Sequence, residues 1–144
     1  MMKQLRDRMR VMTPAEFRSL ESKADKIKVD LLALFHEHVA TAMSTMRRLL
    51  AAPRYADAEW RNELHVEAHN LKGLGGSFDY DLVTIVSGSL CRIARNEGLA
   101  QDAPQQRLLA AHVAALDVII ARKLTGEGGR HGRDLLTTLG IQRA

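Results

Sequence analysis

Residues 67–95 read EAHNLKGLGGSFDYDLVTIVSGSLCRIAR. In this stretch His69 is followed three and four positions later by Lys72 and Gly73, and then by two further glycines. A glycine inside a helix costs about 1 kcal/mol relative to alanine. Three glycines beside one histidine therefore indicate a surface kept bare around the imidazole, so that another protein can come close to it.

The chain on either side of this stretch has the 3.6-residue period of amphipathic helices. Apolar stripes run through residues 27–49, 60–78, 82–93 and 108–120. The first includes Ile27, Leu31, Leu34 and His38. Because the connections between the stripes are short, we expect an all-α fold, an antiparallel up-down four-helix bundle.

Local signals place the helix ends. Asp57 and Asp102 are expected to be N-caps, and Asp79 or Asp81 to begin the helix that follows His69. Thr13-Pro14-Ala15-Glu16 has the pattern of a helix start with a capping box.

Two short helices are expected outside the four. A break near Ser22–Lys28 would separate a short N-terminal helix from the first long one. Gly126–Gly129 has the composition of a flexible linker, and Asp134–Leu139 would form a short C-terminal helix. We therefore divide the chain into a basic N-terminal segment, a helical bundle, and a Gly-rich linker with its short helix, over residues 1–12, 13–125 and 126–144.

Composition narrows the class of protein. Hydrophobic residues make up 46% of the 144 residues and aromatic residues 4%, which favours helices over strands. The net charge of +4 comes from the two ends, since residues 1–12 and 121–144 each carry +3. No basic stripe crosses the body, so nucleic-acid binding is not expected. We also expect no signal peptide and no membrane span, and the single cysteine, Cys91, fits a reducing compartment.

The third stripe defines two faces of one helix. Leu64, Ala68, Leu71 and Phe78 are expected to point into the bundle, and Gly75 to allow close packing. An adjacent stripe then projects outward from a rigid helix and holds His65, His69, Lys72, Gly73 and Gly76. Lys72 lies one turn beyond His69, where its ammonium can offset the negative charge of a phosphoryl group on the imidazole.

The segment AHNLKGLGGSF resembles the signature of the histidine-containing phosphotransfer (HPt) domains of two-component phosphorelays. That family has a histidine, a lysine three on, a glycine four on and then small residues, on the second helix of a four-helix bundle. His69, Lys72, Gly73 and Gly76 fill those positions. The resemblance covers roughly residues 25–124.

The resemblance implies a carrier function and not an enzyme. His69 would accept a phosphoryl group from the aspartate of one receiver domain and pass it to another, while Lys72 stabilises its charge. Partners would be receiver domains of response regulators and of a hybrid histidine kinase. The chain would need no cofactor of its own, because the receiver brings Mg²⁺, and it would be a cytoplasmic monomer without a nucleotide site.

The same resemblance implies a partner-binding surface around the acceptor. Gly73 and Gly76 would give clearance, and His65, Asn70 and Ser77 would contact the receiver. One position departs from the family pattern: many members have a glycine ten residues after the histidine, where this chain has Asp79. That acid could cap the following helix.

Two other functions remain open on the residues alone. The chain could be an adaptor that binds a receiver without carrying phosphate. It could also hold a metal, because His65 and His69 have the i, i+4 spacing of two ligands, although no H-E-x-x-H motif is present. Further ligands would have to come from His36, His38 or His112, each more often a packed or hydrogen-bonded histidine, so no metal site is expected.

Overall fold

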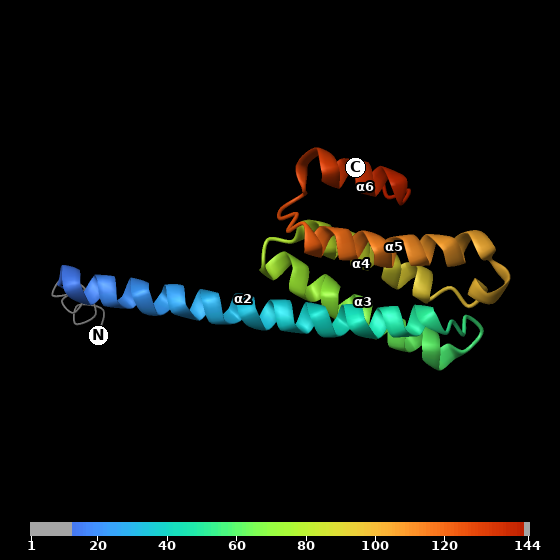
Figure 1. The fold of residues 1–144 in the computed structure, drawn as a ribbon, viewed down its shortest axis with the longest axis horizontal. Helices are drawn as coiled ribbons and strands as arrows, with labels where there is room; N and C mark the ends of the chain where they lie inside the picture. The colour runs from blue at the N-terminus through green and yellow to red at the C-terminus, as the bar shows by residue number, and fades with distance from the viewer. Residues whose placement is uncertain (1–12, 143–144) are drawn as a thin grey trace, which may run out of the picture. The chain divides into compact units, whose positions relative to one another are not determined.

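The computed structural model describes residues 13–142, and the predicted basic segment 1–12 lies outside them. This part of the chain is helical and contains no strand, which confirms the all-α prediction (Figure 1). The elements are α2 (Pro14–Ala51), α3 (Ala58–Ser77), α4 (Asp81–Ala94), the 3₁₀ turn η1 (Leu99–Gln101), α5 (Ala103–Ala121) and α6 (Gly129–Thr138). None of these helices is long and apolar enough to cross a bilayer.

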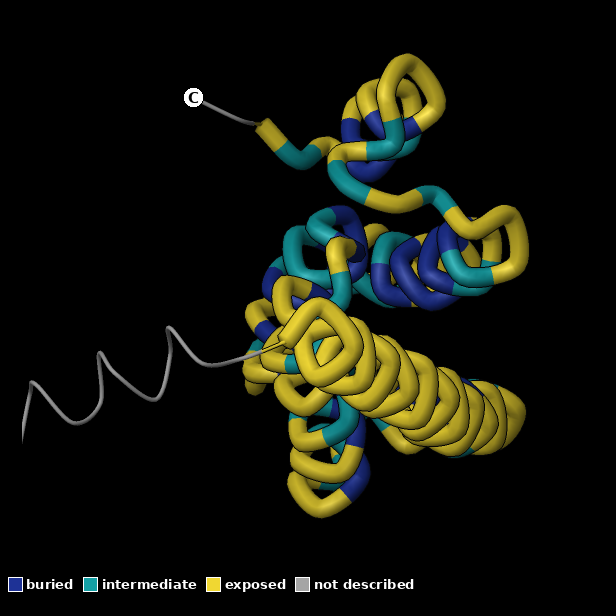
Figure 2. Tube along the Cα trace, turned by 90° about the vertical axis from the view of Figure 1, so that its left-hand side faces the viewer, coloured by how far each residue is buried: buried dark blue, intermediate teal, exposed yellow. Residues whose placement is uncertain are grey.

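Helix α2 is continuous over 38 residues, so the predicted break near Ser22–Lys28 and the separate short N-terminal helix are wrong. The segment contains no glycine or proline that would end a helix. The chain divides into two compact units at His36. In the first unit, residues 13–34 are all exposed, including Ile27, Leu31 and Leu34 of the expected stripe (Figure 2).

The second unit, residues 37–144, contains the helical bundle. Its long helices run up and down in chain order, as predicted (Figure 1). The Trp60 indole donates a hydrogen bond to the Leu49 carbonyl at 3.0 Å, which joins α3 to the end of α2. An ion pair of 2.6 Å between Arg47 and Asp117 joins α2 to α5. The largest fully buried side chains of this unit include Met46, Leu64, Leu71, Leu82, Leu90, Leu109, Leu116 and Ile119.

The predicted caps form. Glu16 N–H donates to the Thr13 hydroxyl at 3.1 Å, completing the capping box with the return bond from Thr13 N–H to the Glu16 carboxylate. Asp57 accepts from Glu59 N–H at 2.9 Å, and Asp102 accepts from Gln105 N–H at 3.1 Å. These caps depend on neighbours three residues away or nearer, so sequence is enough to find them.

The turn between α3 and α4 differs from expectation at Asp79. Its φ is +62°, in the left-handed region, and Tyr80 N–H donates to the Gly75 carbonyl at 2.8 Å, as in a Schellman end. Tyr80 is the N-cap of α4, with no side-chain capping bond, and Asp81 is its first residue. Asp79 therefore terminates α3 and does not cap the next helix.

The segment expected to be a flexible linker is tied to this turn. Gly126 N–H donates to the Asp79 carbonyl at 2.5 Å, and Leu82 N–H donates to the Gly126 carbonyl at 3.3 Å. A Cβ at Gly128 would stand 2.5 Å from the Leu82 side chain. Helix α6 follows at once, beginning at Gly129 and not near Asp134.

A buried histidine links α4 to α5. His112 has no exposed surface; its Nδ1 lies 2.7 Å from the Leu108 carbonyl, and its Nε2 lies 2.8 Å from the Ser89 hydroxyl. Since a carbonyl only accepts, Nδ1 carries the proton and Nε2 accepts from Ser89. Burial lowers the pKa of His112, so the neutral ring is favoured. This is the hydrogen-bonded histidine that we expected there.

Candidate functional site

Helix α3 presents the predicted outward stripe. The side chains of Leu64, Ala68 and Leu71 are fully buried and fix the helix against the bundle. Phe78, the C-cap of α3, is only half-buried, so it lies at the edge of the inward face and not in the core. On the other face, His65 is half-buried. The remaining predicted site residues are exposed: His69, Asn70, Lys72, Gly73, Gly76 and Ser77.

Two of these side chains touch. The rings of His65 and His69 stack, with centroids 6.0 Å apart and planes 15° from parallel. Burial lowers the pKa of His65, and the positive charges of Arg95 and of a protonated His69 lower it further. At neutral pH the ring of His65 is therefore an uncharged neighbour of His69.

Lys72 lies toward α4. Its Cδ and Cε would each be 3.7 Å from a Cβ at Gly88, so the lysine stem passes over this glycine. The Lys72 carbonyl accepts from the Thr84 hydroxyl at 3.1 Å, which fastens this turn of α3 to α4. The structure thus gives the ammonium of Lys72 a supported stem on the same face as His69.

The three glycines of the motif are not equivalent. A Cβ on Gly73 would meet nothing within 4 Å, and one on Gly76 would make only an ordinary contact of 3.8 Å with Thr84. A Cβ on Gly75 would stand 2.8 Å from the Tyr80 carbonyl and 2.9 Å from the Thr84 nitrogen. Gly75 therefore serves close packing, as expected, whereas this fold does not need Gly73 to be a glycine.

A hollow of about 620 Å³ lies beside His69, between α3 and α2. His69, Asn70 and Gly73 line it from α3, and His38 and Thr41 line it from α2. We had assigned His38 to a core stripe, but it is exposed. Thr41 was not considered from the sequence, and His38 was considered only as a stripe residue and a possible metal ligand. A polar residue on an otherwise apolar stripe was the available signal for His38.

Basic side chains gather on the other flank of the stripe. Lys72, Arg92 and Arg95 all lie near enough to Cys91 for their charges to act on its thiol. Burial outweighs them and raises the pKa of that thiol, and Cys91 is buried as expected. Arg92 and Arg95 were not predicted as site residues, although Arg92 lies on α4, which packs against α3, and Arg95 is the C-cap of α4.

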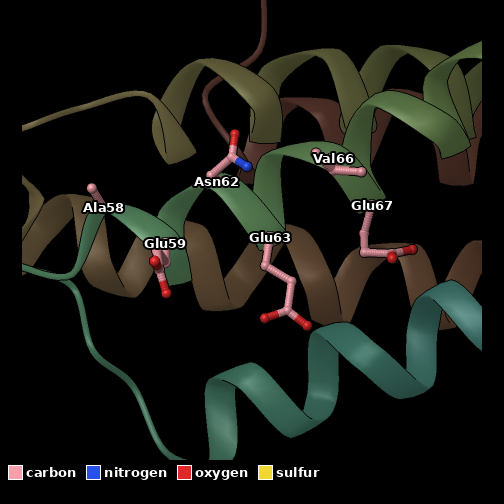
Figure 3. A pocket seen from close by; sticks show the side chains of 6 residues that line it. All are labelled: Ala58, Glu59, Asn62, Glu63, Val66 and Glu67. Atoms are coloured by element: carbon pink, nitrogen blue, oxygen red, sulfur yellow. The ribbon is translucent and has the colours of Figure 1, made fainter.

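The N-terminal half of α3 has the opposite charge. Figure 3 shows a second hollow lined by Glu59, Glu63 and Glu67 together with Ala58, Asn62 and Val66. Glu63 points toward α2, where Arg48 pairs with it at 2.5 Å. Glu67 also lines the hollow beside His69. Acidic and basic groups thus approach His69 from different sides.

The residues that could bind a metal do not gather. Within residues 13–142 no group of three or more His, Cys, Asp or Glu side chains has metal-binding geometry. His65 and His69 face each other as stacked rings, and His112 is engaged by Ser89 and Leu108. The paired histidines therefore have no third ligand among the described residues.

Comparison with protein families identifies a match. A family model described as Hpt domain matches residues 30–118, which is more than half of the chain and includes all of α3 and α4. Searches of curated proteins and of solved structures gave no significant match.

Proposed function

Because the chain belongs to the Hpt domain family, we propose that it carries a phosphoryl group on His69 between two receiver domains. Membership of the family supports a role in histidine phosphotransfer within two-component signalling. The finer assignments, which are the acceptor residue, its helpers and its partners, are our proposal. They rest on the exposed stripe of α3.

Gly73 is the observation that carries this proposal. It lies within a helix, where glycine costs about 1 kcal/mol relative to alanine. Nothing in the described chain stands within 4 Å of the place a Cβ would occupy. The missing side chain therefore serves something outside the chain, and a receiver domain that brings an acyl phosphate up to His69 needs that clearance.

The chemical step needs little beyond positioning and charge. The unprotonated ring nitrogen of His69 attacks the phosphorus of the receiver's phosphoaspartate. The P–N bond forms as the acyl P–O bond breaks, and the aspartate leaves as a carboxylate. The reverse step delivers the group to a second receiver. The receiver's Mg²⁺ neutralises phosphate charge in both directions.

The surrounding side chains assist that step. Lys72, supported over Gly88, offsets the charge that His69 acquires. His65 stacks on His69 and, with Asn70, Gly76 and Ser77, forms the surface that meets the receiver. Arg92 and Arg95 add positive charge on the α4 side, where an acidic partner can dock.

The partners follow from this chemistry. One receiver domain, of a hybrid histidine kinase, would donate the phosphoryl group, and one of a response regulator would accept it. These partners work in the cytoplasm, where we place the carrier. In this scheme the chain supplies the histidine, and we expect it to need no nucleotide site.

A transfer assay tests the proposal. The purified chain is mixed with a phosphorylated receiver domain and Mg²⁺, and acid-labile, base-stable phosphate on the chain is measured. We expect label on the wild type and on His131→Gln, a change at an exposed histidine of α6, and none on His69→Gln. Label that persists on His69→Gln would refute the assignment of the acceptor. Binding of receivers without any label would favour the adaptor function.

A further inference from the structure

The first part of α2 has an exposed apolar stripe whose residues follow a seven-residue repeat. Six residues recur at alternating intervals of three and four, the spacing of the a and d positions of a coiled coil. They are Phe17, Leu20, Ala24, Ile27, Leu31 and Leu34. All lie in the stretch whose exposed character Figure 2 shows, and the five larger side chains are 47–59% exposed. A helix with such a stripe gains stability chiefly by packing it against another element.

We propose that residues 17–34 of α2 form an antiparallel two-stranded coiled coil with a second copy of this chain. The proposal departs from the monomer that we expected from the sequence. It rests on the charged residues that flank the stripe. Their order favours a second copy of this chain in the antiparallel orientation over the parallel one.

A parallel pair of copies would place like charges together. In that arrangement each g position faces the e position five residues further along the second copy. Glu16 would then face Glu21, and Lys23 would face Lys28. Each like-charged contact occurs twice in a symmetric dimer, so the parallel arrangement is disfavoured.

An antiparallel pair brings opposite charges together at the centre of the interface. Positions e then face e, and positions g face g. Glu21 meets Lys28 of the second copy, and Lys23 meets Asp30. Two-fold symmetry repeats each pair, so the centre of the interface is flanked only by opposite charges.

The same register aligns the apolar residues. Next to the two-fold axis, Ala24 packs against Ile27 of the second copy. In the following layer Leu20 packs against Leu31, and at the ends Phe17 packs against Leu34. Small residues face large ones at the centre. Every residue of the stripe therefore has an apolar partner in this register.

Sedimentation equilibrium of the full chain over a concentration series tests the association. A monomer has a mass of 16.0 kDa. We expect the wild type to approach twice that mass. Leu31→Glu should weaken dimerisation roughly a hundredfold or more, because each dimer loses two buried leucines. Val29→Glu is the matched control, since Val29 is 66% exposed and lies off the stripe, and it should leave the dimer intact.

Circular dichroism on Leu31→Glu establishes that the helices persist, as expected for a residue that is exposed within one copy. A wild type that stays at the monomer mass at every concentration would overturn the proposal, and the stripe would then be covered within the chain or by a different protein. Equal weakening by Leu31→Glu and Val29→Glu would also overturn it.

The charge change Lys28→Glu tests the orientation. In the antiparallel dimer it sets the introduced carboxylate against Glu21 of the second copy twice, so dimerisation should weaken several-fold. Adding Glu21→Lys should restore it. In a parallel dimer Lys28→Glu would instead replace the Lys23–Lys28 repulsion by attraction, and tighter association would contradict the antiparallel arrangement.

Discussion

The imidazole rings of His65 and His69 lie one helical turn apart on α3 and stack, with 6.0 Å between their centroids. A group added to the exposed ring of His69 must therefore be sensed by the ring of His65. Both the rate of transfer to His69 and the pKa of His65 should therefore depend on this pair of rings.

His65→Ala should slow phosphoryl transfer to His69 several-fold while leaving stability nearly unchanged. The side chain borders the acceptor ring, but it is half-buried and is not part of the core. Rapid-quench transfer kinetics and urea unfolding measure the two effects. Val66→Ala is the control, because Val66 is 44% exposed on the same helix. Transfer at the wild-type rate would remove His65 from the site.

The pKa of His65 should rise when His69 is phosphorylated. In the unphosphorylated chain, the pKa of His65 is lowered by burial and by the charges of Arg95 and His69. A phosphoryl group at the neighbouring ring brings negative charge, which stabilises the imidazolium form. An NMR titration of the His65 ring with and without phosphate on His69 checks the direction. The same titration on Lys72→Ala should show a larger rise, since one offsetting cation is gone.

Gly73→Ala should stabilise the fold by about 1 kcal/mol and still impair transfer. The added methyl meets nothing within 4 Å among the described residues, but under the proposed function it would stand where a receiver approaches. Gly75→Ala should instead destabilise by about 1–3 kcal/mol, because its methyl overlaps the Tyr80 carbonyl and the Thr84 nitrogen. Urea unfolding measures the stability of both variants, and transfer kinetics measure the effect of each on phosphoryl transfer. An unimpaired Gly73→Ala would mean that no partner needs the clearance.

Asp79→Gly should raise the free energy of unfolding by about 1 kcal/mol, because residue 79 has a φ of +62° and glycine adopts it without strain. Lys123 is the comparison site, with a φ of +52° just after α5, and Lys123→Gly should act in the same direction. Both are measured by urea unfolding. A loss of stability in Asp79→Gly would show that its carboxylate stabilises the turn more than its backbone conformation costs.

Stability should fall as the pH is lowered below about 6.5, the ordinary pKa of histidine. Burial holds the pKa of His112 below that value in the folded chain, and His65 is shifted the same way. The unfolded state therefore binds more protons over this window, and each such group adds a slope of up to about 1.4 kcal/mol per pH unit. Urea midpoints between pH 7.5 and 5 measure it. His112→Gln should remove most of this pH dependence of stability. An equally steep dependence in that variant would show that other groups cause it.

Sequence predicted the features of this fold that depend on near neighbours. The caps at Thr13, Asp57 and Asp102 could be found because each bond joins residues close in the chain. The faces of α3 followed from its period, so the outward position of His69 and the packing role of Gly75 were both predicted.

Other features depended on contacts that local patterns do not specify. The stripe through Ile27 and Leu31 showed that an apolar face exists, but not that it stays exposed in the chain. Asp79 could not be assigned to the left-handed region, because aspartate is equally common as an N-cap. His38 was placed in the core by its spacing, yet it is exposed and lines a hollow together with residues of α3.

The two hydrogen bonds of Gly126, to the Asp79 carbonyl and from Leu82 N–H, have a consequence for the limits of the domain. A shortened chain that stopped at residue 118, where the family match ends, would leave the Asp79 carbonyl and the Leu82 N–H to water. That turn anchors the end of the helix that bears His69. The segment that follows α5 therefore stabilises the end of the helix that bears His69, and the smallest version of the domain that keeps these bonds extends beyond residue 118.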